Sequence, residues 1–225
     1  MGDFSKFRKL ICGVSCLTVL SVCAENPVIN FDERTGSVGV FHCFENPSWI
    51  AAFKVMQYDE KFKPMKQFVF DGAEMEGRLT TFNGERIPLK IQYSKKSPTE
   101  VHVKLQAAAA KPFSSSRLMY EQFMRYVPGE GIKVTINNKV YDYRKPFDPK
   151  KPYQLLVPAL KDNGITTVTV DAPKGMWTIK GNFAVILQDM RQWKTDALQL
   201  RLMFSPYDGM ITNSILEFDL AVEAK

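Results

Sequence analysis

The sequence predicts an all-β protein folded as a large antiparallel β-sandwich. Apolar and polar side chains alternate with a period of two along most of the chain, which is the pattern of strands that bury one face. Asn, Asp, Gly and Pro separate these segments at short intervals. Many short strands at such spacing are typical of a sandwich or barrel. We favour one sandwich of many strands, with assembly from two β-rich halves left open, over two independent domains.

The alternation is strongest in four segments, at 87–93, 101–107, 198–204 and 216–222. In the first of them the apolar residues Ile87, Leu89 and Ile91 alternate with proline, lysine and glutamine. In a strand this places the apolar side chains on one face and the others on the opposite face. Enrichment in β-branched and aromatic residues between turns predicts further strands. These are expected at 38–44, 49–57, 77–82, 132–136, 139–143, 153–159, 165–171, 176–180 and 183–189.

Asparagine, aspartate and glycine mark the tight turns. Asn137-Asn138 separates two expected strands, and Asn tolerates the positive φ that short hairpin turns require. Asn83-Gly84 and Asp162-Asn163-Gly164 are expected to serve in the same way, and Asp208-Gly209 precedes the last strand. The Pro-rich segment 145–152 is expected to be a stiff surface loop between strands.

Two neighbouring segments leave alternatives open. Residues 114–126 fit a strand, but they also place several apolar side chains on one helical face, and the serines at 114–116 are suitable helix caps. The run 107–116, which reads AAAAKPFSSS, marks a possible subdivision of the chain into two halves. Its alanines fit the end of a strand equally well.

The first 24 residues have the form of a cleavable signal peptide. A basic start that ends at Lys9 is followed by the apolar run Leu10–Val22 and by the small residues Cys23 and Ala24. The run is shorter than the roughly 20 residues that a membrane-spanning helix needs, and we expect no transmembrane segment. The mature chain is therefore predicted to be residues 25–225, exported to the periplasm or the extracellular space.

A lipid anchor at Cys23 is the alternative to a soluble exported form. The residues before this cysteine resemble a bacterial lipobox, but Val22 is bulkier than the Gly or Ala that usually stands there, so the soluble form is favoured. Of the four cysteines, only Cys43 lies outside the signal peptide. A single cysteine forms no internal disulfide, and we expect Cys43 to be a small buried group on a strand.

Charge and motifs exclude several classes of function. Residues 25–225 carry 27 basic and 23 acidic side chains, a formal net charge of +4 without a basic stripe, so a nucleic-acid partner is not expected. Nucleophile elbows, phosphate loops, dinucleotide fingerprints and zinc-protease motifs are all missing from the sequence. With His42 expected in the core and His102 at the surface, we predict no metal site, no cofactor and no catalytic residue. This counts against an enzyme without excluding one.

The segment Gln188–Asp196 is the most informative for function, because it connects two strong strands with acidic, basic, amide and indole groups. An indole can stack on the apolar face of a sugar while polar side chains hydrogen-bond its hydroxyls. The candidate ligand-binding residues are Asp189, Arg191, Trp193 and Asp196. Alternatively, an Asp–Arg pair braces the loop and Trp193 plugs one end of the sandwich. The other two tryptophans, Trp49 and Trp177, are expected in the core.

Two stretches resemble carbohydrate-associated proteins. Residues 176–222 read MWTIKGNFAVILQDMRQWKTDALQLRLMFSPYDGMITNSILEFDLAV and resemble the closing segment of β-sandwich domains in secreted bacterial proteins of polysaccharide breakdown. Asp32-Glu33-Arg34-Thr35-Gly36 is similar to the opening of galactose-mutarotase-like supersandwich domains. The resemblance implies a carbohydrate-related role. It carries over no catalytic residues, because the His pair and carboxylate of mutarotases have no matching positions.

Three functions follow as hypotheses. The leading one is an exported, non-catalytic β-sandwich that binds a carbohydrate or another cell-surface component. The second is a carbohydrate-active enzyme, a glycosidase or lyase. The third is a structural or assembly component of an envelope or extracellular complex, whose strand edges recruit another chain.

Overall fold

The computed structural model describes most of the chain after the expected signal peptide. The described residues are 28–32, 36–42, 48–58, 70–71, 76–80, 86–125, 131–173, 175–204, 206–207 and 209–223. The expected signal peptide 1–24, Cys43 and the Asn83-Gly84 turn lie outside them. Among the described residues, no helix has the length and apolar character that crossing a membrane requires.

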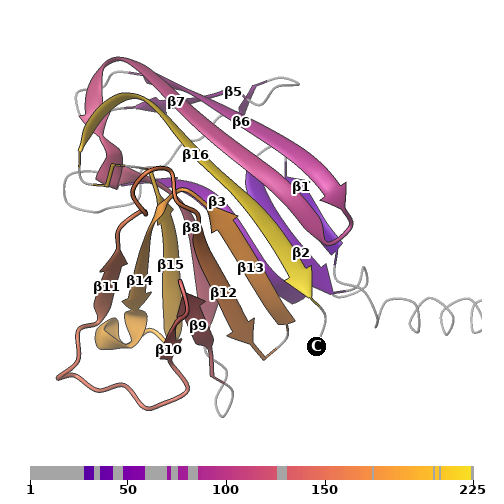
Figure 1. The fold of residues 1–225 in the computed structure, drawn as a ribbon, viewed down its shortest axis with the longest axis vertical. Helices are drawn as coiled ribbons and strands as arrows, with labels where there is room; N and C mark the ends of the chain where they lie inside the picture. Colours follow the sequence, from indigo (N-terminus) through magenta and orange to yellow (C-terminus); the bar gives the residue numbers. More distant parts are fainter. Residues whose placement is uncertain are drawn as a thin grey trace, which may run out of the picture.

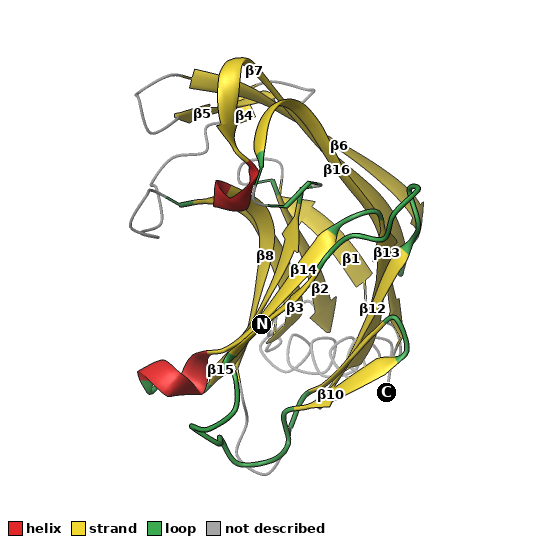
Figure 2. Ribbon diagram, turned by 60° about the vertical axis from the view of Figure 1, so that its left-hand side comes forward, coloured by secondary structure: helices red, strands yellow, loops and turns green. Residues whose placement is uncertain are grey.

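The strands form two antiparallel sheets that face each other, which confirms the predicted all-β sandwich (Figures 1 and 2). The seven-stranded sheet has the order β1 (Val28–Asp32), β2 (Ser37–His42), β3 (Ser48–Gln57), β8 (Leu118–Arg125), β15 (Ala197–Met203), β14 (Ala184–Asp189), β11 (Gln154–Val157). The nine-stranded sheet has the order β10 (Lys139–Asp142), β9 (Lys133–Ile136), β12 (Thr166–Ala172), β13 (Gly175–Gly181), β16 (Met210–Glu223), β7 (Glu100–Ser114), β6 (Arg86–Ser97), β5 (Glu76–Thr80), β4 (Phe70–Asp71).

Every segment that the sequence predicts as a strand contains one. The turn residues behave as expected where they are described, since Asn137, Asn138, Asp162 and Asn163 all have positive φ. The predicted and the observed strands differ most in their lengths. Strands β7 and β16 are longer than the alternation suggested, and the alanines of 107–110 belong to β7.

The segment 114–126 contains a strand, so its helical interpretation is wrong. A single 3₁₀ turn, η1 (Ser115–Arg117), precedes β8. Strand β8 pairs with β3 on one side and with β15 on the other. Leu118, Tyr120 and Met124 reach the core at alternate positions, and this tertiary environment outweighs the helical spacing of the apolar residues.

The inner faces of both sheets meet in one apolar core that contains most of the large side chains. Trp177 is buried there, as predicted, and its Nε1 donates to Oε1 of Gln122 on the opposite sheet over 3.1 Å. Tyr120 packs edge-on against Phe218 with ring centroids 5.3 Å apart, and its hydroxyl donates to Gly36 O over 2.8 Å. The indole N–H, the phenol and the Gln122 carbonyl oxygen thus have partners, as burial requires, whereas Nε2 of Gln122 is buried without a partner among the described residues.

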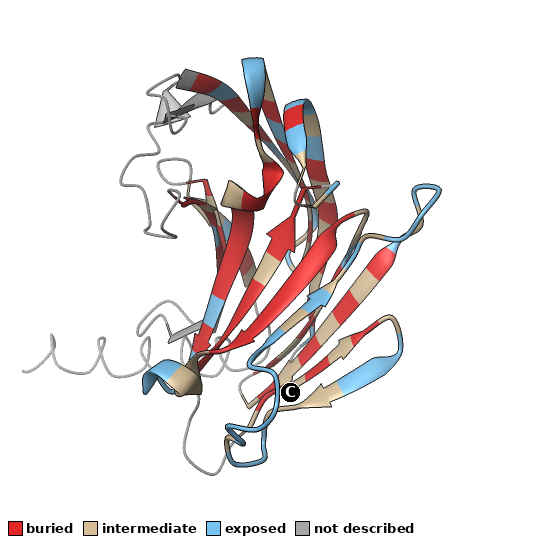
Figure 3. Ribbon diagram, turned by 90° about the vertical axis from the view of Figure 1, so that its left-hand side faces the viewer, coloured by how far each residue is buried: buried red, intermediate tan, exposed pale blue. Residues whose placement is uncertain are grey.

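The centre of the seven-stranded sheet is buried on its outer face as well. Strand β14 is buried at every position, whereas β12 alternates between buried and partly buried residues (Figure 3). A small second cluster that includes Met119, Ile186 and Met203 lies on this outer face. Tyr58 belongs to this cluster and donates to the buried carboxylate of Glu121, and burial raises the pKa of Tyr58 well above its usual range.

Replacing the core indole tests this packing. Trp177→Phe leaves Gln122 Oε1 without its donor and opens a cavity, so we expect a loss of about 2–3 kcal/mol in the free energy of unfolding. Urea denaturation monitored by circular dichroism measures it. The matched control is Trp193→Phe at the exposed tryptophan, which should change stability by less than about 0.5 kcal/mol. Equal effects of the two substitutions would contradict the assignment of Trp177 to the core.

Candidate functional site

The segment 188–196 forms a tight turn at the end of β14. Asp189 is the last residue of β14, and the 3₁₀ helix η2 (Met190–Trp193) follows directly. The Asp189 side chain accepts from the backbone N–H of Arg191 over 3.1 Å and caps the helix. Lys194 ends it in the left-handed conformation, with φ of 60°. The local sequence therefore specifies the turn from both ends.

Asp189 and Arg191 hold each other in a forked ion pair. Arg191 Nε lies 2.9 Å from Asp189 Oδ1, and Arg191 Nη2 lies 2.6 Å from Asp189 Oδ2. The remaining nitrogen donates to the backbone oxygen of Lys145 over 2.9 Å, and the guanidinium stands 5.8 Å from the ring centre of Phe147. Arg191 is only 17% exposed. The pair therefore fastens the turn to the loop between β10 and β11, as the bracing alternative predicts.

The same fork occurs at the start of that loop. Arg144 donates to Asp142 through Nε over 2.8 Å and through Nη2 over 2.6 Å, and the two residues are again two positions apart in the chain. These bonds hold the pKa of the Asp142 carboxyl far below its usual range. The Arg144 side chain, however, is 58% exposed. The chain thus contains a solvated and a shielded version of one interaction.

Trp193 does not plug the sandwich. It is 47% exposed and meets Tyr153, which is 42% exposed, edge to face with ring centroids 5.2 Å apart and an angle of 81° between the planes. We call these two residues the aromatic corner. Backbone hydrogen bonding fixes its second member, since Asp189 N–H donates to Tyr153 O over 2.7 Å. Two exposed rings are therefore held at right angles on a braced turn.

The loop between β10 and β11 supplies aromatic groups that the sequence-based choice of site residues missed. Tyr143, Phe147 and Tyr153 all come from it. Burial and, to a smaller extent, the negative charge of Asp189 together raise the pKa of Tyr143 to about 12. The phenol hence stays protonated at neutral pH. The sequence predicted that the Pro-rich segment of this loop is stiff. It did not predict that the loop brings Tyr153 into contact with Trp193.

Of the four predicted site residues, Asp189 and Arg191 are in direct contact, and Trp193 belongs to the same helical turn. Asp196 is exposed near the end of the segment. Polar side chains continue from this turn across the outer face of the seven-stranded sheet, because Gln188 lies opposite both Gln154 and Gln199 in the strand register. Gln154 directly follows Tyr153 and is exposed.

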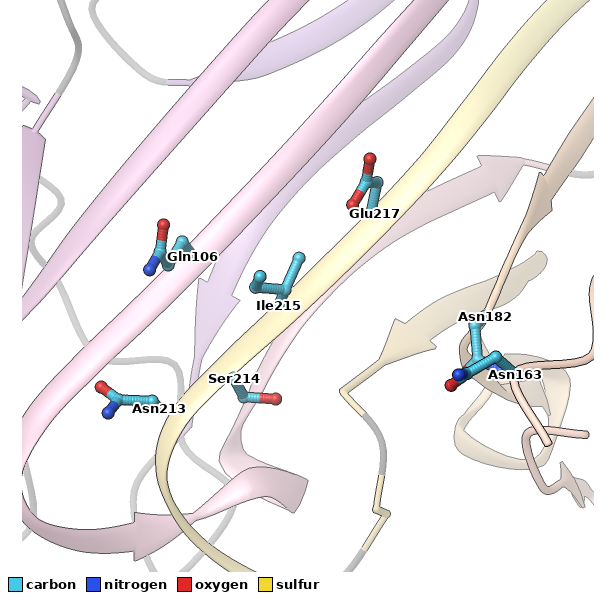
Figure 4. A pocket seen from close by; sticks show the side chains of 7 residues that line it. All are labelled: Gln106, Asn163, Asn182, Asn213, Ser214, Ile215 and Glu217. Carbon is cyan, nitrogen blue, oxygen red and sulfur yellow. The ribbon is translucent and has the colours of Figure 1, made fainter. Parts of the chain in front are cut away.

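A second candidate site is an open pocket at the far end of the sandwich. It has a volume of about 630 Å³, and its lining contains amide, hydroxyl and carboxylate groups together with one exposed isoleucine (Figure 4). One wall belongs to β7 and β16, and the other to the turns before β12 and after β13. The lining residues are Gln106, Asn163, Asn182, Asn213, Ser214, Ile215 and Glu217.

His102 lies on the polar face of β7, as predicted, between two carboxylates of β16. Its Nδ1 is 2.9 Å from Asp219 Oδ1, and its Nε2 is 2.9 Å from Glu217 Oε1. Lys96 also reaches Asp219 over 2.8 Å. Burial acts to raise the pKa of Asp219, but the hydrogen bonds from Lys96 and His102 outweigh it and hold that pKa below its usual value.

In the part of the chain that the structure describes, His, Cys, Asp and Glu side chains form no group of three or more that is arranged to hold a metal ion. Comparison of the chain with models of known protein families and with curated proteins gives no match. The resemblance to carbohydrate-associated domains therefore stays a prediction from the sequence.

The two Asp–Arg forks allow a matched test of bracing. Arg191→Lys loses the forked pair and the contact with Lys145 O, so we expect the free energy of unfolding to fall by about 1–2 kcal/mol. Hydrogen exchange in the loop 143–153 should also become faster. Arg144→Lys alters the solvated fork and should leave stability unchanged within error in urea denaturation. A larger loss of stability in Arg144→Lys than in Arg191→Lys would show that Arg191 does not fasten the loop.

The Asp219 cluster should contribute to stability in a pH-dependent way. A carboxyl whose pKa is depressed in the folded chain stabilises it above its unfolded-state pKa of about 3.9, and this contribution disappears as the pH falls through the folded-state pKa. Asp219→Asn should therefore cost less than about 1 kcal/mol at pH 7, because the group is partly solvated. The difference from the wild-type chain should shrink below pH of about 4 in denaturation curves. A constant difference down to pH 2 would argue against the cluster.

Proposed function

We propose that the chain is an exported, non-catalytic β-sandwich that binds carbohydrate at the aromatic corner. The observation that supports it is the half-exposed indole of Trp193, which stands at a right angle to the exposed ring of Tyr153 on a braced turn. Export itself is proposed from the N-terminal sequence.

Exposed aromatic rings suit a sugar because a pyranose has one apolar face made of C–H groups. Such a face packs on an indole, which has a large apolar surface and a single polar edge. Large side chains exposed singly are common on protein surfaces, but Trp193 is one of two exposed rings in contact. Together they form a corner rather than an isolated residue, so one ring can stack while the other bounds the sugar at its side.

The bracing of the turn reduces the entropic cost of binding. A ligand loses affinity when it must order the side chains that it contacts. Here the cap of η2 and the Asp189–Arg191 fork already fix the backbone that carries Trp193. In this proposal Asp189 and Arg191 position the site, and the hydroxyls of the sugar meet the exposed groups around it, Asp196 and Gln154.

The arrangement favours binding over glycoside hydrolysis. A glycosidase needs a pair of carboxyl groups across the scissile bond, one of which acts as an acid or base. Asp189 is the carboxylate directly beside the corner, and four hydrogen bonds from Arg191 to its Oδ1 and Oδ2 already occupy it. A carboxylate held in this way is a structural group, which supports a non-catalytic role.

Affinity electrophoresis in gels that contain soluble β-1,4-glucan, β-1,3-glucan, xylan or galactomannan tests the proposal. We expect the mature chain to be retarded by at least one of them. Trp193→Ala should weaken that binding at least tenfold, because the stacking surface is lost, and Tyr153→Ala should weaken it to a smaller extent.

The control is Ile165→Ala, which removes an exposed apolar side chain away from the corner and should leave the retardation unchanged. Circular dichroism would verify that all variants are folded. Retardation that survives Trp193→Ala would remove the corner from the binding site. No retardation of the wild-type chain in any of the four gels would reject the proposed ligand class that they sample.

A further inference from the structure

The edge of β16 beside the amide-lined pocket has no strand partner among the described residues. Strand β13 pairs with β16 only from Gly181 opposite Phe218 to Met176 opposite Glu223. On its other side, β16 continues alongside β7 as far as Met210. Over 211–217, then, β16 is an edge strand as far as the described part of the chain goes, and the pocket lies where a longer β13 would run (Figure 4).

Gly181 accounts for the end of β13. A Cβ atom on this residue would lie 2.2 Å from the carbonyl oxygen of Glu217 and 3.0 Å from the ring of Phe183. Only glycine permits so close an approach. The chain then leaves the sheet, and Phe183 and β14 continue in the opposite layer. The edge of β16 beyond this point is thereby left open.

The backbone groups on this edge are placed for another strand. The N–H of Val222 donates toward β7, to Thr99 O over 2.9 Å. Successive residues of a strand direct their N–H and C=O groups to opposite sides. The backbone groups of Ser214 and Leu216 therefore also point to β7, whereas those of Asn213 and Ile215 point to the open edge. The register shift between β7 and β16 lies between Ile211 and Asn213, which leaves residues 213–217 regular.

This edge has little of the protection that exposed strand edges usually carry. Natural edge strands are commonly blocked by Lys, by Pro or by a bulge within the strand. Residues 211–216 read Ile-Thr-Asn-Ser-Ile-Leu, without a charge or a proline; Glu217 is the one charged residue of the edge, and the register shift with β7 lies at its start, between Ile211 and Asn213. Ile215 is moreover 45% exposed and lines the pocket. The edge therefore combines free backbone groups with an apolar contact.

We propose that this edge binds an extended, uncharged segment of a partner polypeptide, which adds to the nine-stranded sheet as a strand alongside residues 211–217 of β16. This is an assembly function, distinct from the carbohydrate site at the aromatic corner. Main-chain hydrogen bonds to Asn213 and Ile215 supply the pairing. A β-branched side chain of the segment packs on Ile215.

The opposite wall of the pocket determines the kind of occupant. The turns that carry Asn163 and Asn182 stand across from β16 (Figure 4). Asn182 is held there because its Nδ2 donates to Gly164 O over 3.0 Å. The edge strand of a second folded copy would bring its own neighbouring strand about 4.8 Å further out, into this wall. A single extended segment brings no second strand with it, and in this arrangement the amides of Asn163 and Asn182 would face its far side.

The experiment uses Ile215→Pro, which removes the N–H donor that faces the open edge and leaves the bonds to β7 in place. Proline is tolerated at such positions of edge strands. The matched control Ile215→Thr retains the N–H. A phage library of random decapeptides is selected on the wild-type chain, and the Kd of an enriched synthetic peptide is measured by fluorescence polarisation. We expect an alternating, β-branched peptide whose binding Ile215→Pro weakens at least tenfold and Ile215→Thr weakens much less.

Hydrogen exchange of the free chain is the second measurement. We expect fast exchange of the Asn213 and Ile215 amides, slow exchange of Ser214 and Leu216, and protection of the first pair when the selected peptide is added. Protection of Asn213 and Ile215 without peptide would overturn the proposal. Protection that does not depend on the protein concentration would mean that another segment of the same chain covers the edge. Protection that increases with the protein concentration would mean that a second copy of the chain covers it.

Two other outcomes would also overturn it. One is the absence of any peptide that discriminates the wild-type chain from Ile215→Pro. The other is that Ile215→Pro abolishes retardation in the glycan gels while Trp193→Ala is still retarded like the wild-type chain. That result would make the pocket a sugar site. Trp193→Ala should leave peptide binding unchanged, so failure of the carbohydrate proposal and failure of this one are distinguishable.

Discussion

The mutual burial of the inner faces of two sheets holds this protein together. Within the described residues, one continuous core takes side chains from nearly every strand. The only cysteine outside the expected signal peptide is Cys43, so residues 25–225 cannot form a disulfide among themselves. Hydrogen bonds also join the layers inside the core, as the bond from Trp177 to Gln122 shows. The position of every surface feature depends on this packing, because the loops and edges are simply the places where the two layers end.

Short-range patterns made the strands predictable. A period of two is a local property, and the alternation of Val101, Val103 and Leu105 into the core is what the sequence suggested. The order of the strands was not predictable, because β8 pairs with β15 and β7 with β16 across long stretches of chain. The ambiguous segment 114–126 shows the same limit, since its strand pairing on both sides is decided by tertiary contacts.

In the candidate sites, too, local contacts were predictable from the sequence and long-range contacts were not. The pairing of Asp189 with Arg191 spans two positions, and the sequence already suggested it as one alternative. The meeting of Trp193 with Tyr153 depends on a loop that returns from the other sheet, which no local pattern reveals. The open edge of β16 is harder still to predict, because it results from a difference in length between two neighbouring strands and from the close approach at Gly181.

The two ends of the sandwich differ in how their layers are joined. At the lower end in Figure 1, the loop from β10 to β11 passes from one sheet to the other, and the guanidinium of Arg191 ties it to the end of β14. At the upper end, the long β7 and β16 reach beyond β13, and the chain changes layer there from β7 to β8 and from β15 to β16. The two crossings are bonded to each other, because Ser115 Oγ donates to Pro206 O over 2.7 Å and accepts from the N–H of Gly209 over 3.0 Å. Both layers are therefore held in place where β16 has its unpaired edge, so a guest strand would meet a template that is already positioned and would join two molecules without having to order it.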